Sequence, residues 1–319
     1  MPYPEIRPRR LRRNAACGGW SPRPASTRPS WSCRCSSRGL TEPRQIASLP
    51  GCSSTPGLPA QGRRGGGPGR VAGSCSSACR SPGRDRSAGS TRGHPQRRIR
   101  DVVAEVGDAT VVMSDLCLDE FTSHGHCGCS PRRRGDNDAT LTAYAEMAWP
   151  RPTPGPRGRA VRMMDVRWAW SAGLDAAGHQ DVAVLAYAVK YASAFFGRSG
   201  RGGVVPGGRP AQLPADPANL RESLREVELD VAEGADMVMV KPALPYLDVV
   251  SAVRAAVDVP VAAYQVSGEY AMVEAAAANG WIDRERVILE TLTSIRRAGA
   301  QIILTYWAVE AAQLLRQRY

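Results

Sequence analysis

Lysine is almost absent from this sequence, and so are long apolar runs and aromatic side chains. Of the 42 basic residues only two, Lys190 and Lys241, are lysines, and the other 40 are arginines. Aromatic residues make up 6% of the chain, which leaves few rings on which nucleic-acid bases could stack. No apolar run is long enough to span a bilayer, and the basic start MPYPEIRPRRLRRN lacks the apolar core of a secretory signal. The sequence therefore predicts a protein of the cytoplasm with no membrane partner.

The net charge of +12 is distributed unevenly along the 319 residues. Residues 1–100 hold 20 arginines against three acidic residues, whereas residues 101–319 hold 22 basic against 27 acidic residues. A basic binding face spread over one fold is therefore excluded, and nucleic acid is not an expected partner. The alternative of an Arg-rich nucleic-acid-binding protein rests on the first hundred residues alone.

Composition also divides the chain into two predicted units, residues 1–100 and 101–319. Most of the first unit is poor in Val, Ile and Leu, rich in Arg, Gly, Ser and Pro, and without strand or helix periodicity, which is typical of disorder. Its six cysteines match no usual zinc spacing, and no secretory signal favours disulfides. We expect this unit to be a low-complexity basic segment and the second unit to be the folded domain.

Short apolar runs alternate with amphipathic stretches after residue 100. The runs are rich in Val, Ile and Ala, as buried parallel strands are. This alternation predicts an α/β fold, most simply a (β/α)8 barrel. The expected strands are 108–116, 182–190, 236–241, 260–267 and 301–306, and the expected helices are 221–234, 247–257, 272–280 and 284–299.

Polar or reactive residues stand at the ends of these expected strands. Lys190, Lys241 and Tyr306 close three runs, Ser267 lies just past the end of a fourth, and a cysteine-containing cluster follows the fifth. In a (β/α)8 barrel the active site is built at the C-terminal ends of the strands. We therefore expect these residues to share one site.

The two lysines are candidate nucleophiles. Burial after an apolar run lowers the pKa of an amine, and two ammonium groups in one cavity would lower the first pKa further. A neutral amine attacks a ketone to give a carbinolamine and then a Schiff base, which arginine cannot do. A single lysine at a strand end more often forms a surface ion pair. Two lysines that are the only ones in the chain, both at strand ends, favour catalysis.

Thiol, imidazole and carboxylate side chains are concentrated between residues 114 and 128. Cys117, Asp119 and Cys127 could supply three ligands and leave a fourth position for water, as in catalytic zinc sites. Two thiolates favour zinc, whereas sets made only of carboxylates favour magnesium. The alternative is a reduced loop whose polar side chains face solvent, and the spacing alone does not decide between the two.

Long stretches of the second unit resemble the porphobilinogen synthase family, also called δ-aminolevulinic acid dehydratases. The most specific are VMVKPALPYLD, YQVSGEYAM and GWIDRERVILETLTSIRRAGA, and RPRRLRR near the start resembles a remnant of the family's N-terminal arm. The resemblance implies a (β/α)8 barrel with an arm, assembled as a homo-octamer. It also implies the condensation of two 5-aminolevulinate molecules into porphobilinogen with loss of two waters, an early step of haem synthesis.

The resemblance assigns roles to the residues at the strand ends. Lys241 in MVKP is implied to be the principal Schiff-base lysine, and Lys190 in YAVKYAS the second. Ser267 in VSGEY and Tyr306 in LTYW are implied to hold the carboxylate of one substrate.

The resemblance also implies two metal sites. Cys117, Asp119 and Cys127 fall on the three ligand positions of a zinc site, with Asp119 where zinc-type members have a third cysteine. Glu226 matches a carboxylate that holds an allosteric magnesium in many bacterial members. The alternative for Glu226 is an ordinary exposed glutamate on a helix.

The match to the family breaks in blocks. WPRPTPGPRGRAVRMMDVRWAWSA replaces a helix, a strand and a PSDMMDGR-like turn, and RSGRGGVVPGGRPAQLPA replaces a lid with a GPFRDA-like motif. Arg201 and Arg209 are therefore only the nearest candidates for the lid arginines that bind the other substrate's carboxylate. Residues 52–96 replace two expected strands, which predicts an incomplete barrel with open edges.

The replacement blocks share an enrichment in Arg, Gly, Pro, Ser and Trp, which is typical of a GC-rich gene read in the wrong frame. We hypothesise several compensated frame slips, and we expect the chain to fold poorly and to be weakly active or inactive. A non-functional remnant is one alternative to the enzyme. A class I aldolase is another, although such aldolases need neither a second lysine nor a Cys/Asp/His cluster.

Overall fold

The structure is a computed structural model. It describes residues 111–116, 180–196 and 215–318, positions 140, 144 and 178, and the backbone of segments 30–38, 44–45, 53–54, 71–79 and 160–164. The strands are β1 Ser30–Arg38, β2 Arg44–Gln45, β3 Ser53–Ser54, β4 Val71–Cys79, β5 Val111–Asp115, β6 Ala160–Met164, β7 Ala183–Lys190, β8 Met237–Lys241, β9 Val261–Tyr264 and β10 Ile302–Thr305. The helices are α5 Leu220–Ala232, the 3-10 turn η4 Leu244–Tyr246, α6 Leu247–Ala256, α7 Ser267–Ala278, α8 Arg284–Arg297 and α9 Ala308–Arg318.

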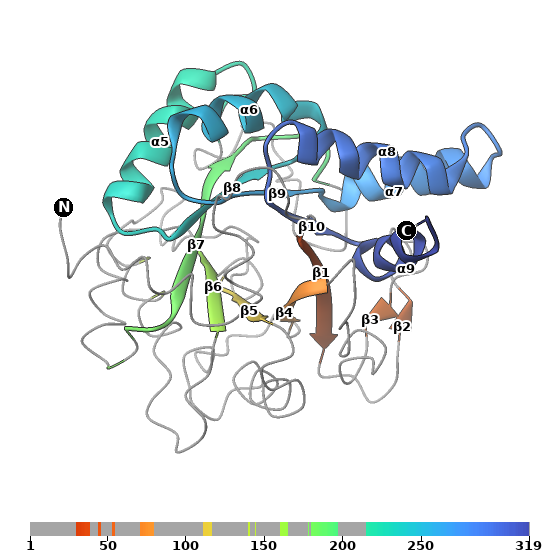
Figure 1. Ribbon diagram of the computed structural model, residues 1–319, viewed down its shortest axis with the longest axis horizontal. Coiled ribbons are helices and arrows are strands. Elements are labelled where there is room, and N and C mark those ends of the chain that lie inside the picture. Colours follow the sequence, from red (N-terminus) through yellow and green to blue (C-terminus); the bar gives the residue numbers. More distant parts are fainter. Residues whose placement is uncertain are drawn as a thin grey trace, which may run out of the picture.

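Eight parallel strands close into one barrel, with neighbours in the order β1, β10, β9, β8, β7, β6, β5 and β4. Figure 1 shows α5 beside α6 and α7 beside α8, and both pairs are in contact. The predicted α/β barrel is confirmed, and its five expected strands and four expected helices are present. The helix expected over 272–280 begins earlier, at Ser267. In the part of the chain that the structure describes, no helix is long and apolar enough to cross a bilayer.

The expectation of an incomplete barrel with open edges is wrong. β1 and β4, both from residues 1–100, pair with each other and close the ring by pairing with β10 and β5. β6 comes from a block that departs from the family pattern, yet it pairs with β5 and β7. Because a parallel ladder is made by backbone N–H and C=O groups, a segment poor in Val, Ile and Leu can still complete it. The rest of residues 1–100 lies outside the described residues, so its disorder stays a prediction.

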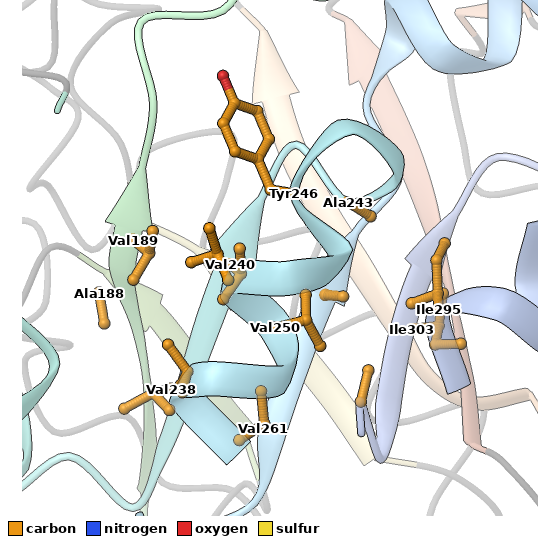
Figure 2. Close-up of a cluster of buried hydrophobic side chains, with 14 of the residues drawn as sticks. Ala188, Val189, Val238, Val240, Ala243, Tyr246, Val250, Val261, Ile295 and Ile303 are labelled. Carbon is orange, nitrogen blue, oxygen red and sulfur yellow. The ribbon is translucent and has the colours of Figure 1, made fainter. Parts of the chain in front are cut away.

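Side chains alternate between two buried clusters along each central strand. Val238 and Val240 of β8 pack in an outer cluster that also contains residues of α5, α6 and α8, and Figure 2 shows both valines with Val250 of α6. Met237 and Met239 belong to a second cluster formed mainly by strand residues, which fills the barrel interior. The period of two therefore decides which residues of a strand can reach an active site inside the barrel.

An ion-pair network joins the last three helices. The Arg284 guanidinium at the start of α8 donates to both carboxylate oxygens of Glu274 on α7 and of Glu310 on α9. Glu274 also accepts from the Trp307 indole N–H at 2.6 Å. Because Trp307 follows Tyr306 directly, this network helps to fix the end of β10.

Candidate active site

The two lysines end neighbouring strands and lie directly opposite each other in the ladder between β7 and β8. Lys241 continues the alternation of Met237 and Met239, which places it on the interior side of the barrel. Its exposed fraction is 9%, whereas Lys190 is half-buried. The structure therefore brings the only two lysines of the chain to one level of the barrel, at the C-terminal ends of adjacent strands.

A β-bulge in β7 brings Lys190 to the same side as Lys241. Just before Val189, β7 has one residue more than β8 between consecutive paired positions. Ala188 and Val189 consequently both pack in the outer cluster, and the alternation resumes with Lys190 on the inner side. Bulges next to active sites commonly re-aim a side chain in this way.

Two tyrosine rings surround the Lys241 amine. Its Nζ lies 3.5 Å from the centroid of the Tyr187 ring and 6.0 Å from that of Tyr264. The Tyr187 hydroxyl donates to Asp115 Oδ1 at 3.1 Å, so a carboxylate at the end of β5 fixes the orientation of the ring. Ring faces attract a cation and keep bulk water from the amine. Sequence reasoning missed these three residues, although inward alternation along the expected strands is a signal for both tyrosines.

The two residues predicted to bind a substrate carboxylate stand just after the ends of β9 and β10. Ser267 is the first residue of α7, Tyr306 follows β10, and both are half-buried. The hydroxyls of Tyr306 and Tyr264 are 3.5 Å apart. Because the Tyr264 ring is also close to Lys241, Tyr306 belongs to the same mouth of the barrel.

Buried hydrogen bonds hold the strand ends that carry these hydroxyls. Thr305 Oγ1 donates to Gln265 Oε1 at 2.8 Å and accepts from the Trp307 backbone N–H at 3.3 Å. Gln265 is completely buried and Thr305 is 1% exposed. This pair joins β9 to β10 close to Ser267 and Tyr306, so it sets the backbone positions of both.

A completely buried carboxylate stands two residues after Ser267. Glu269 has no exposed surface, and its carboxylate accepts from the backbone N–H groups of Ala243, Leu244 and Val266. Burial raises the pKa of Glu269 from 4.5 to about 7, although the three N–H groups act in the opposite direction. Sequence reasoning missed Glu269, although it stands in the VSGEY motif.

Of the remaining predicted site residues, only Glu226 lies in the part of the chain that the structure describes. Glu226 lies on the exposed face of α5. β5 ends at Asp115, two residues before Cys117 in the sequence. Among the described residues, no three His, Cys, Asp or Glu side chains form a group that could hold a metal. The predicted residues outside the described part of the chain are Cys117, Asp119, Cys127, Arg201 and Arg209.

Sequence comparison connects this geometry to known enzymes. The family profile described as delta-aminolevulinic acid dehydratase matches residues 81–314. The chain belongs to the delta-aminolevulinic acid dehydratase family. A Streptomyces coelicolor dehydratase is 58% identical over 226 residues, which are 69% of this chain and 68% of that protein. A Mycobacterium tuberculosis dehydratase is 55% identical over 219 residues, 67% of this chain and 66% of that protein.

Structural comparison covers more of the chain than the sequence matches do. The crystal structure of the delta-aminolevulinic acid dehydratase (porphobilinogen synthase) from Toxoplasma gondii ME49, in complex with its product porphobilinogen, has a TM-score of 0.82 and 32% identity. The match covers 98% of this chain and 92% of that chain. The predicted family and enzyme class, a hydro-lyase of porphyrin synthesis, are confirmed, and they are favoured over a nucleic-acid-binding protein. The roles of individual residues stay predictions.

Proposed function

We propose that this chain joins two molecules of 5-aminolevulinate into porphobilinogen and releases two waters, with Lys241 and Lys190 as the Schiff-base lysines. The observation that carries the proposal is the pairing of the only two lysines, opposite each other on adjacent strands at the barrel mouth. Membership of the dehydratase family and the likeness to a structure that contains porphobilinogen support it.

Two amines suit a reaction in which two ketones are joined. Each lysine amine adds to one ketone carbon and expels the ketone oxygen as water, giving an imine. The new C–C and C–N bonds form between the two substrates, and both lysines are released as free amines, so two waters leave per porphobilinogen. Lys241, held between two tyrosine rings, is the drier of the two sites, whereas the half-buried Lys190 is the more accessible.

The hydroxyls beside the lysines can orient the substrates. We assign Ser267 and Tyr306 to the carboxylate of one substrate, because hydroxyl groups donate hydrogen bonds to carboxylates and both residues lie at the mouth. Arg201 and Arg209 are the candidates for the carboxylate of the other. Holding both substrates in one site makes their joining effectively unimolecular, which supplies about 7–11 kcal/mol in favourable cases.

Metals, assembly and location complete the proposal. Cys117, Asp119 and Cys127 offer two thiolates and a carboxylate, a donor set that fits zinc, and Cys117 is two residues after the end of β5 in the sequence. When bound there, zinc would supply Lewis-acid polarisation of a carbonyl or activation of water. Glu226, exposed on α5, is the candidate ligand of an allosteric magnesium. We also propose a homo-octamer in the cytoplasm, on the family resemblance.

Borohydride trapping tests the proposal. The purified chain is mixed with 5-aminolevulinate, reduced with borohydride and mapped by peptide mass spectrometry. We expect an adduct on Lys241 in the unaltered chain and none in Lys241→Arg, which keeps the charge but cannot form an imine. Porphobilinogen formation should fall by about 10,000-fold or more in Lys241→Arg. A folded, unaltered chain that forms no adduct would refute the proposal and favour the non-functional remnant.

A further inference from the structure

The two residues after Ser267 connect α7 to the loops that follow both lysines. The Gly268 backbone N–H donates to the Phe195 carbonyl at 2.9 Å, and Phe195 lies five residues after Lys190. A Cβ atom at position 268 would lie 2.2 Å from that carbonyl oxygen. Only glycine therefore permits this close approach between the loop after β7 and the start of α7.

The Glu269 side chain makes the matching connection to the loop after Lys241. Its Oε1 accepts from the Leu244 N–H at 2.6 Å, and its Oε2 accepts from the Ala243 N–H at 3.3 Å. Oε2 also accepts from the Val266 N–H at 2.6 Å, one residue before Ser267. One carboxylate thus joins the segment after Lys241 to the segment that carries Ser267.

The chemistry of the three donors requires a carboxylate. All three partners are backbone N–H groups, so each needs an acceptor, and both oxygens of an ionised Glu269 can accept. A glutamine would turn its NH2 group toward at least one of these N–H groups, because it has a single acceptor oxygen. The side chain is completely buried, so an N–H that loses its acceptor stays unsatisfied at a cost in free energy.

We propose that Glu269 is a positioning residue of the condensation, which holds the loop after Lys241 and the start of α7 in one geometry, while Gly268 holds the loop after Lys190 against the same turn. The Ser267–Glu269 turn thereby sets the two amines and the Ser267 hydroxyl relative to one another. This inference rests on the proposed function, because it needs both lysines to form imines. Glu269 contacts backbone N–H groups rather than a reacting atom, so its effect is on geometry.

The test compares Glu269→Gln with the unaltered chain and with Val273→Ala. Val273 is a buried residue on the same helix that packs in the outer cluster, and its apolar side chain forms no hydrogen bond, so its truncation perturbs the packing of α7 while the hydrogen bonds to both loops remain. We measure kcat, KM and the rate of the borohydride-trapped adduct on Lys241, with circular dichroism and thermal unfolding as controls of folding. A misplacement of about 1 Å can cost about 100-fold in rate. We therefore expect kcat and adduct rate to fall by about 10- to 100-fold in Glu269→Gln, with KM changed less than about threefold.

The outcomes separate the inference from the function on which it rests. In Val273→Ala the unfolding midpoint should fall while kcat stays within about twofold of the unaltered chain. No adduct in the unaltered chain overturns the proposed function itself. An adduct in the unaltered chain with an equal kcat in folded Glu269→Gln overturns the positioning role alone, and so does an equal loss of kcat in Val273→Ala. If Glu269→Gln does not fold, Gly268→Ala takes its place, and an unchanged kcat there has the same meaning.

Discussion

Raising the pH should destabilise this protein through a single buried group, Glu269. The carboxyl group is completely buried, and the groups that face it are the backbone N–H donors of Ala243, Leu244 and Val266. Burial raises its pKa to about 7, from 4.5 as the ordinary value. Glu269→Gln removes this titration while keeping almost the same side-chain volume, so the variant provides the reference.

The sign follows from proton binding. Between pH 4.5 and about 7 the folded chain holds a proton on Glu269 that the unfolded chain has lost. The contribution of Glu269 to the free energy of unfolding is therefore largest below pH 4.5. It falls as the pH rises through this window and levels off above pH 7. At about 1.4 kcal/mol per pKa unit, the difference between the two pKa values corresponds to about 3 kcal/mol.

Urea unfolding of the unaltered chain and of Glu269→Gln, followed from pH 5 to pH 8, measures this contribution. Other groups titrate in both proteins, so the informative quantity is the change with pH of the difference between them. We expect the unaltered chain to lose about 2 to 3 kcal/mol relative to the variant over this range. A difference that stays constant, or that grows in favour of the unaltered chain, would refute the reasoning. The latter result would show that the three hydrogen bonds to the ionised carboxylate outweigh the cost of burying it.

Two other predictions concern Asp236, just before β8, and the predicted zinc ligands. Asp236→Ala should lower stability in urea unfolding by about 1–3 kcal/mol, because Asp236 Oδ2 accepts from the buried Val184 N–H at 2.8 Å. Because this contact lies at the start of β8, kcat per folded molecule should not change, and a drop in kcat would contradict a purely structural role. Cys117→Ser and Cys127→Ser should each lose nearly all bound zinc, measured by atomic absorption after dialysis, because thiolates bind zinc far better than hydroxyls. Cys129 lies two residues after Cys127 and is not one of the predicted ligands. Cys129→Ser is therefore the control that should keep its zinc, and full zinc in all three variants would exclude these thiols as ligands.

The strands and helices of the second half of the barrel could be predicted because each has a recognisable pattern of apolar residues within its own sequence. Every residue of β8, MVMVK, is buried, as its continuous apolar run predicts for a strand covered on both faces. Helix α8 likewise has caps formed by its own residues at both ends. Asp283 accepts from the Arg286 N–H at its start, and Gly299 follows its end with a φ of +119°.

The strands β1 and β4 could not be predicted, because nothing in their own sequences requires a strand. SWSCRCSSR and VAGSCSSAC contain a single Val and no Ile or Leu, so neither has an apolar run, and the one short alternation, Trp31, Cys33 and Cys35, stands in an Arg- and Ser-rich context. Their position is set by partners far away in the chain: β1 pairs with β10 from Ser30–Ile302 to Cys33–Thr305. Which strands pair with β1 and β4 therefore depends on closing the whole barrel, and the nine residues of either strand do not show it.

Sequence analysis predicted only those described site residues that stand at or just after the end of an apolar run. Both lysines, Ser267 and Tyr306 stand where an apolar run stops, which is a visible signal. Which residues surround the Lys241 amine depends on how the strands pair, that is, on their register. Tyr187 faces inward because it precedes the bulge in β7, and Asp115 reaches its hydroxyl across the mouth from β5. A period-of-two count along β7 without the bulge would have turned Lys190 toward the helices.

Because the barrel is closed, weak activity of this chain would not by itself indicate poor folding. An open barrel would have made poor folding the first explanation, but the replacement blocks supply β4 and β6, and the eight-stranded barrel has no open edge. The sheet that carries Lys241 and Lys190 is therefore a closed ring. Arg201 and Arg209 stay the nearest candidates for the lid arginines that bind the other substrate. An adduct on Lys241 without porphobilinogen would accordingly place the defect in binding of the other substrate, and not in the fold.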